Sequence, residues 1–120
     1  MAREEATRQA RQFNPLYFDF DSYAIRDGEK EMLADYTKRL ADNGDLTVAL
    51  EGHCDERGTT AYNLALGQKR ADSVRTYLTR AGIAAERLTT VSYGEERPAD
   101  PRHDEAGWAL NRRVELVAAN

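Results

Sequence analysis

The chain has 120 residues, with 17 Lys and Arg against 21 Asp and Glu, so its net charge is −4. A chain of this length forms one domain and buries about two thirds of its unfolded surface, so it folds without disulfides or metals. The single Cys excludes an intrachain disulfide and a Cys-rich zinc site. The weakly acidic balance argues against nucleic-acid binding. No run approaches the roughly 18 apolar residues of a membrane span.

The N-terminal segment differs in composition from the rest of the chain. Residues 1–14 are polar and of mixed charge, and we interpret them as a flexible arm or linker. Residues 15–120 carry the periodic patterns of a folded domain. Because no apolar signal-peptide core is visible, we expect either a cytoplasmic chain or a trimmed piece of an exported one.

A strand and a helix are predicted at the start of the domain. The segment PLYFDFD, residues 15–21, alternates strictly and predicts a strand whose buried face carries Leu16, Phe18 and Phe20. Residues 28–43 predict a helix that ends at an Asn-Gly pair. Its apolar stripe consists of Met32, Leu33, Tyr36 and Leu40.

The middle of the chain predicts a strand, a loop and a long helix. The inward side chains of the strand are Leu46, Val48 and Leu50. The polar loop GHCDERGT, residues 52–59, follows the strand. Thr59 is the predicted N-cap of a helix over residues 60–81, which Gly82 ends.

The last third of the chain predicts two further strands. They cover residues 87–93 and 113–118, and a long loop with two prolines and a short helical turn at 106–112 separate them. The order β-α-β-α-β-(short α)-β implies an α/β fold, an α+β sandwich in layer terms. We expect one mixed sheet with the two main helices packed on one face.

The long helix predicts two stripes when it is wound at 100° per residue. The stripe expected in the core consists of Leu64, Gly67, Ala71, Val74 and Leu78. The second stripe, rotated by about 90°, consists of Asn63, Leu66 and Arg70. Gly67 and Ala71 would let the helix lie close to the sheet.

The second stripe begins beside a charged loop, where α/β folds commonly bind ligands. The loop carries Asp55 and Arg57 at the carboxyl end of a strand. Arg70 offers a fork suited to a carboxylate, and Asp55 suits an ammonium. The set therefore predicts a site for a zwitterion. The alternative is that Asp55 and Arg70 pair with each other, as surface charges commonly do.

Four segments of the chain resemble the family of OmpA-like peptidoglycan-binding domains. They are LYFDFDSYAIR (16–26), EGHCDERGTTAYNLALGQKRADSVRTYL (51–78), VSYGEERP (91–98) and GWALNRRVEL (107–116). Within that family, the pair Leu66–Gly67 and the segments DERGT and HDEA are typical of the peptidoglycan-associated lipoproteins. The resemblance spans residues 16–118.

The resemblance implies non-covalent binding of peptidoglycan through the meso-diaminopimelate of its stem peptide. By motif position, Asp55 would bind the ammonium and Arg70 the carboxylate. The remaining implied ligand residues are Arg57, Phe20, Asp21 and Leu66, supported by Asn63, Cys54 and Arg112. No metal or cofactor is implied.

The resemblance also implies a place in the cell envelope. A lipid anchor, absent from this chain, would hold the protein in the outer membrane, so that the domain in the periplasm tethers that membrane to the cell wall within the Tol-Pal system. TolB is the implied protein partner, with residues 94–105 and the face around Tyr23 as candidate contacts. An alternative is that TolB binding is the main role.

Two alternatives use the Cys and the His residues. In a cell-wall hydrolase, Cys54 would be the nucleophile and His53 or His103 the base. His53 and Cys54 are adjacent on an extended chain and point to opposite faces, so they do not pair easily. A metal site would use His53, Asp55, Glu56 and His103. We expect instead a hydrogen-bonded structural His53, a buried Cys54 and no enzymatic activity.

Overall fold

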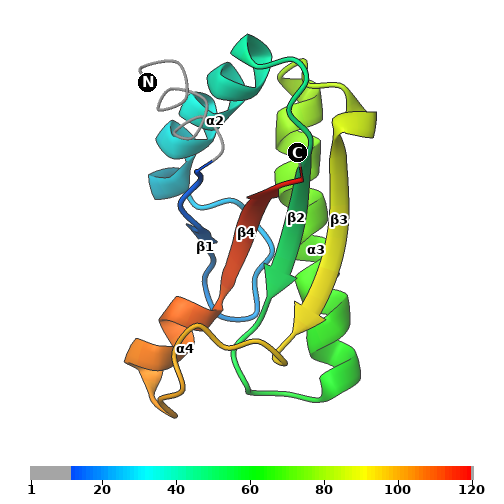
Figure 1. Ribbon diagram of the computed structural model, residues 1–120. Helices are drawn as coiled ribbons and strands as arrows, with labels where there is room; N and C mark the ends of the chain where they lie inside the picture. Colours follow the sequence, from blue (N-terminus) through cyan, green and yellow to red (C-terminus); the bar gives the residue numbers. More distant parts are fainter. Residues whose placement is uncertain (1–11, 120) are drawn as a thin grey trace, which may run out of the picture.

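The computed structural model describes residues 12–119, which form one four-stranded sheet with helices against it (Figure 1). The strands are β1 (Leu16–Tyr17), β2 (Val48–His53), β3 (Leu88–Gly94) and β4 (Arg113–Ala118). The helices are α2 (Lys30–Asp42), α3 (Thr60–Arg80) and α4 (Glu105–Asn111), and 3-10 turns cover Asp27–Glu29 and Ala85–Arg87. The predicted element order is confirmed.

The sheet is mixed, with strand order β1-β4-β2-β3. β2 and β3 are parallel and are joined by α3, whereas β4 runs antiparallel to both β1 and β2. The carboxyl ends of β2 and β3 therefore meet at the edge where α3 begins, at the lower end of the molecule in Figure 1. This is the edge at which the sequence places the charged loop.

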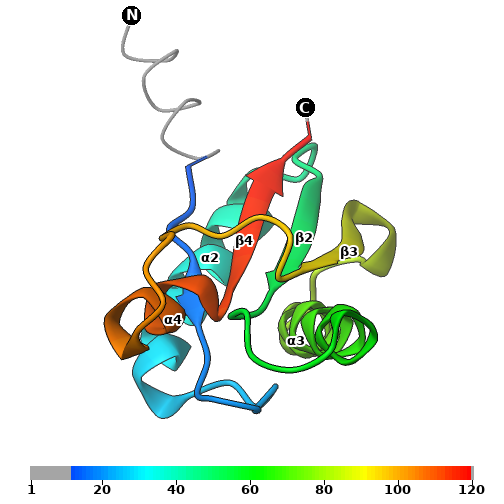
Figure 2. The same ribbon diagram turned by 90° about the horizontal axis from the view of Figure 1, so that it is seen from below.

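Both long helices cover the same face of the sheet. Leu50 of β2 lies in register with Leu116 of β4, and Val48 lies in register with Leu88 of β3, so these side chains share one face. The core joins that face to side chains of α2 (Leu33, Tyr36, Leu40) and of α3 (Ala71, Val74, Leu78). Figure 2, in which the molecule is seen from below, shows α3 lying against β2 and β3.

α3 comes unusually close to the sheet at a pair of glycines. A Cβ atom on Gly67 would lie 3.0 Å from the carbonyl oxygen of Gly52, and a Cβ on Gly52 would run into the backbone of Gly67. The absence of both side chains lets α3 approach β2 backbone to backbone, as the sequence predicted for Gly67. This contact fixes how far the second stripe of α3 stands from the end of β2.

The ends of α3 follow the predicted capping. The Thr59 side chain accepts a hydrogen bond from the main-chain N–H of Tyr62 at 3.1 Å. At the other end Gly82 has φ +108°, and the N–H of Ile83 donates to the carbonyl of Leu78. These bonds satisfy main-chain groups that a helix end leaves unpaired.

Two predicted packing positions are wrong. β1 covers only Leu16–Tyr17, because the chain turns away from the sheet toward α3, with Asp21 at φ +54°. Phe18 is still buried, but Phe20 is 57% exposed and does not share the core with it. Leu64 is 37% exposed and is not among the core residues; it lies beside Gly94 at the end of β3, which has no side chain to pack on it.

The predicted N-terminal arm lies mostly outside the described residues, because residues 1–11 are not described. Phe13 packs edge-on against the ring of Tyr36, with the ring centroids 4.9 Å apart, and the N–H of Asn14 donates to the Tyr36 hydroxyl. Residues 13 and 14 are therefore in contact with α2. Within residues 12–119, no helix is long and apolar enough to cross a bilayer.

Candidate ligand-binding site

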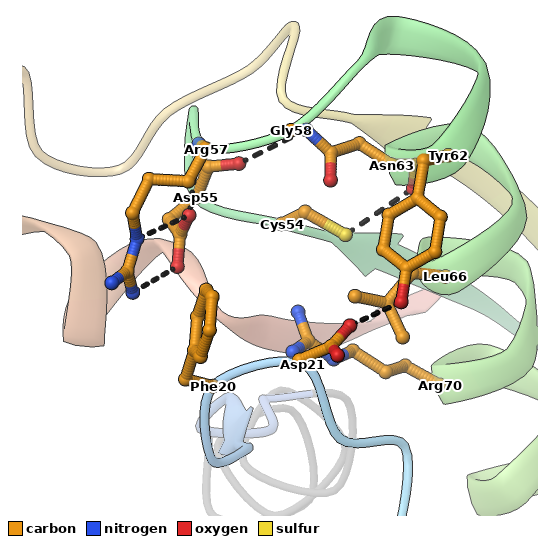
Figure 3. Close-up of a pocket in the computed structure, with 10 residues that line it drawn as sticks. All are labelled: Phe20, Asp21, Cys54, Asp55, Arg57, Gly58, Tyr62, Asn63, Leu66 and Arg70. Atoms are coloured by element: carbon orange, nitrogen blue, oxygen red, sulfur yellow. Dashed lines mark hydrogen bonds and ion pairs between the residues drawn. The ribbon is translucent and has the colours of Figure 1, made fainter.

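A cavity of about 200 Å³ opens where β2 ends and α3 begins (Figure 3). Its lining contains the six predicted ligand residues and two of the three supporting ones. The lining consists of Phe20, Asp21, Cys54, Asp55, Arg57, Gly58, Tyr62, Asn63, Leu66 and Arg70. The third supporting residue, Arg112, is not among them. The loop after β1 and the stretch that runs from the end of β2 into α3, more than 30 positions apart in the sequence, therefore converge on one cavity.

Asp55 is buried, with 5% of its surface exposed, and accepts three hydrogen bonds from Arg57. Arg57 donates to Asp55 from its main-chain N–H at 3.0 Å, from Nε at 3.2 Å and from a terminal nitrogen at 2.9 Å. Burial alone would raise the pKa of Asp55, but these bonds outweigh it and the pKa is lowered. The same pairing raises the pKa of Arg57. Asp55 is therefore a fixed carboxylate at the cavity wall.

The Arg57 side chain is held between two aromatic rings. Its guanidinium lies 3.9 Å from the centroid of the Phe20 ring and 4.1 Å from that of the Trp108 ring. Cation–π contacts of this kind stabilise an arginine without neutralising it. The exposure of Phe20 is thus explained by a partner outside the core, and Phe20 forms part of the cavity wall.

Arg70 is the largest buried side chain of the molecule's described part and is 1% exposed. Nε donates to the carbonyl of Ser22 at 2.8 Å, and the terminal nitrogens donate to those of His53 at 2.9 Å and Asp19 at 3.1 Å. Two of its five N–H groups find no acceptor among the described residues. Burial lowers the pKa of Arg70. The alternative of an Asp55–Arg70 pair is wrong, since Asp55 pairs with Arg57 and lies near Arg112.

The rim of the cavity carries a contact that the sequence did not predict. The Tyr62 hydroxyl donates to the carboxylate of Asp21, which joins the loop after β1 to the first turn of α3. Tyr62 and Trp108 were both missed as site residues. Tyr62 directly precedes Asn63 of the second stripe, so its place on the first helical turn was a usable signal. Nothing in the local pattern around Trp108 pointed to Arg57.

Asn63 and Cys54 hold the loop rather than add charge. The Asn63 side-chain amide donates to the Asp55 carbonyl at 3.4 Å and to the Glu95 carboxylate at 3.2 Å. Cys54 is buried as predicted, and its thiol donates to the carbonyl of Asn63 at 3.2 Å. Burial raises the pKa of Cys54 to about 11, so the thiol stays protonated, which disfavours a nucleophilic role.

The histidines lie apart from the cavity. His53 stacks on Tyr93 at 5.5 Å on the other face of the sheet, and His103 pairs with Glu56 at 2.7 Å on the surface. The prediction that His53 is hydrogen-bonded is wrong: within residues 12–119 neither ring nitrogen has a hydrogen-bond partner, because the Glu115 carboxylate stays 3.8 Å away. Among the described residues no three ligands gather as around a metal ion.

We expect His53 to make stability depend on pH between about 4 and 6.5. Burial lowers its pKa from 6.5 to about 4, so in this window the unfolded chain binds a proton that the native chain does not. The free energy of unfolding should therefore fall by about 2 kcal/mol as the pH drops from 7 to 4.5. Urea denaturation at pH 7 and pH 4.5 measures this change in the free energy of unfolding. His53→Phe should make the change smaller, and His103→Gln, the control, should leave it as it is. An unchanged slope in His53→Phe would contradict the assignment.

The match to a family model decides the family. The model described as "OmpA family" matches residues 17–112, which include every residue that lines the cavity. The chain belongs to the OmpA family. The prediction of an OmpA-like domain, made from the four sequence segments, is confirmed.

Curated relatives of this OmpA-family chain carry the name peptidoglycan-associated lipoprotein. The chain is 46% identical to the peptidoglycan-associated lipoprotein of Pasteurella multocida, and the match covers 88% of this chain and 70% of that protein. It is 47% identical to the protein of the same name from Haemophilus influenzae, with 88% of this chain and 69% of that protein covered. It is 46% identical to that of Pseudomonas aeruginosa, of which it spans 62%. The relatives are named for an association with peptidoglycan and not for a reaction, in agreement with the expected lack of enzymatic activity.

Solved structures agree with this assignment. The crystal structure of the peptidoglycan-associated lipoprotein from Burkholderia pseudomallei is similar, with a TM-score of 0.85 and 44% identity over 87% of this chain and 88% of that one. The cell wall anchor of the T6SS from Pseudomonas aeruginosa is also similar, with a TM-score of 0.74 and 25% identity. That match covers 98% of this chain and 94% of the other. The predicted fold, one mixed sheet with its helices, is confirmed.

Proposed function

We propose that this domain binds peptidoglycan non-covalently, through the meso-diaminopimelate of the stem peptide. Membership of the OmpA family and relatives named for association with peptidoglycan support a role in anchoring to the cell wall. The chemistry of the cavity supports the finer assignment to diaminopimelate. That residue carries an ammonium and a carboxylate on the carbon at its free end.

One observation carries this proposal: the charges that line the cavity are mixed and cancel. Asp21 and Asp55 contribute two carboxylates, and Arg57 and Arg70 contribute two guanidinium groups. A neutral lining with fixed opposite charges complements a group that carries both signs, and it gives no net attraction to a simple anion or a simple cation. The free end of diaminopimelate is such a group.

The orientation of the ligand follows from the free donors and acceptors. Arg70 keeps two N–H groups without an acceptor in the described structure, and a carboxylate accepts two such bonds in a fork. The Asp55 carboxylate has about four lone-pair sites, and Arg57 uses three of them. The ligand ammonium would take the remaining site, and Leu66 would pack on its methylene groups.

The envelope role rests on the relatives. We propose that the domain serves as the periplasmic part of an outer-membrane lipoprotein, tethering that membrane to the cell wall within the Tol-Pal system. The names of the relatives, which include the word lipoprotein, support this location. The anchor itself would precede the domain.

A second candidate function is the binding of TolB. Two exposed aromatic side chains, Phe20 and Tyr62, line the cavity, and a third, Tyr23, follows on the loop that carries Phe20 and Asp21. Aromatic side chains grouped at a surface favour protein contacts. A partner that covered Phe20 and Tyr62 would also close the cavity, so TolB and peptidoglycan would compete. Addition of TolB should then release the domain from peptidoglycan.

The direct test is sedimentation with purified peptidoglycan. The domain should pellet with peptidoglycan that contains meso-diaminopimelate and stay in the supernatant with peptidoglycan that contains lysine at the same position. Free meso-diaminopimelate should release it, whereas lysine with both α groups blocked (Nα-acetyl-lysine amide), which carries an ammonium alone, should not at the same concentration. Equal pelleting with both kinds of peptidoglycan would contradict recognition of diaminopimelate.

A further inference from the structure

Arg112 lies behind Asp55, outside the lining of the cavity, and is 6% exposed. Its Nε donates to the carbonyl of Phe18 at 2.9 Å, and one terminal nitrogen donates to the Glu105 carboxylate at 2.9 Å. The other terminal nitrogen is buried and finds no hydrogen-bond acceptor within residues 12–119. It lies 3.6 Å from an Asp55 carboxylate oxygen, so its charge is directed at the group that would receive the ligand ammonium.

The buried charges of the site do not cancel, although those of the cavity lining do. Asp55, Arg70 and Arg112 are each at least nine-tenths buried, which makes one carboxylate against two guanidinium groups. Arg57 and Asp21 are more exposed, so water screens them more strongly. The Glu105 side chain, which pairs with Arg112, is 67% exposed and is screened in the same way. The interior of the site therefore has a surplus of one positive charge.

We propose that Arg112 determines specificity by acting through Asp55: its buried positive charge disfavours a ligand that brings an ammonium alone. This inference rests on the proposed function and assigns selection against lysine to a residue that does not touch the ligand. An ammonium bound to Asp55 is repelled by Arg112. In diaminopimelate the carboxylate on the same carbon is attracted by the same charge, which offsets the repulsion. Lysine has no such carboxylate at the end of its side chain.

The test measures, by calorimetry, how tightly the protein binds two stem tripeptides: L-Ala-γ-D-Glu-meso-diaminopimelate and the same peptide with L-Lys in the third position. Arg112→Gln removes the charge and keeps hydrogen-bonding groups. It should reduce the preference for the diaminopimelate peptide over the lysine peptide about tenfold, mainly because the lysine peptide binds more tightly. Arg112→Lys keeps the charge and should retain the ratio of the unsubstituted protein.

Arg113→Gln is the matched control. Arg113 is as buried as Arg112, but it binds Glu115 and the carbonyl of Arg97 away from the cavity. A purely structural loss weakens both peptides together and leaves the ratio unchanged, so an unchanged ratio in Arg112→Gln would overturn this inference while diaminopimelate binding stands. If the unsubstituted protein binds neither peptide, the proposed function fails first.

A second variant decides the matter if Arg112→Gln does not fold. Glu105 is exposed and begins α4, so Glu105→Gln should leave the fold intact. It removes the carboxylate that partly neutralises Arg112, and it should widen the preference for the diaminopimelate peptide about two- to threefold. A narrowed or unchanged preference would overturn the inference.

Discussion

Asp55→Asn is expected to abolish pelleting with peptidoglycan and to weaken binding of the diaminopimelate tripeptide at least about 100-fold. The amide occupies the same space as the carboxylate but has no charge to bind an ammonium. The buried groups that remain, Arg70 and Arg112, are both positive. Calorimetry with the tripeptide measures the loss, and pelleting measures it on the polymer.

The stability of Asp55→Asn should fall far less than its affinity. The amide oxygen still accepts from the main-chain N–H of Arg57, while the paired guanidinium groups lose their anion. We expect about 1–2 kcal/mol less free energy of unfolding, which leaves the domain folded at room temperature. Glu31→Gln, on the exposed side of α2, is the control and should bind normally. Pelleting retained by Asp55→Asn would remove Asp55 from the site.

Arg70→Ala is expected to lower the free energy of unfolding by about 3–5 kcal/mol, in addition to abolishing binding. The substitution removes the donor from three main-chain carbonyls, those of Asp19, Ser22 and His53, and leaves a cavity under Phe18. Urea denaturation monitored by circular dichroism measures the loss. Arg80→Ala, an exposed position on the same helix, should stay within about 0.5 kcal/mol of the unsubstituted protein.

This expectation differs from what the motif alone suggests for a ligand residue, which is lost binding with an unchanged fold. Because Arg70 has both roles, Arg70→Ala cannot separate them. Arg70→Lys keeps the positive charge, but an ammonium has three donors, whereas the planar guanidinium has five for three carbonyls and a ligand carboxylate. This variant should therefore remain folded and bind much more weakly. A domain of unchanged stability in Arg70→Ala would show that the three carbonyl contacts contribute little.

Periodicity predicted the fold well where an element spans several residues of one period. The bounds of α3 and β4 and the caps at Thr59 and Gly82 came from local rules that the tertiary structure leaves intact. β1 was predicted too long, because its aromatic alternation continues past the point where Arg112 and Arg70 capture the carbonyls of Phe18 and Asp19. Those contacts join residues more than 50 positions apart, which no local pattern reports.

Most of the residues that line the cavity were predicted, but their pairings were not. Spacing on α3 placed Asn63, Leu66 and Arg70 together, and all three are buried there. The sequence did not reveal that Asp55 pairs with Arg57, two residues away, instead of with Arg70. Nor did it reveal the Phe20 and Trp108 rings around Arg57, because that arrangement depends on how α4 packs against the loop after β1.

The three carbonyl contacts of Arg70 also decide how the domain would respond to mechanical tension. A bound stem peptide that is pulled by the cell wall would transmit the force to one guanidinium group. That group is bonded to the end of β2 in the middle of the sheet, and to two points of the loop that follows β1. A pull on one side chain is thereby divided among α3, the central strand and the loop, so that no single peripheral segment would have to resist the force between wall and membrane.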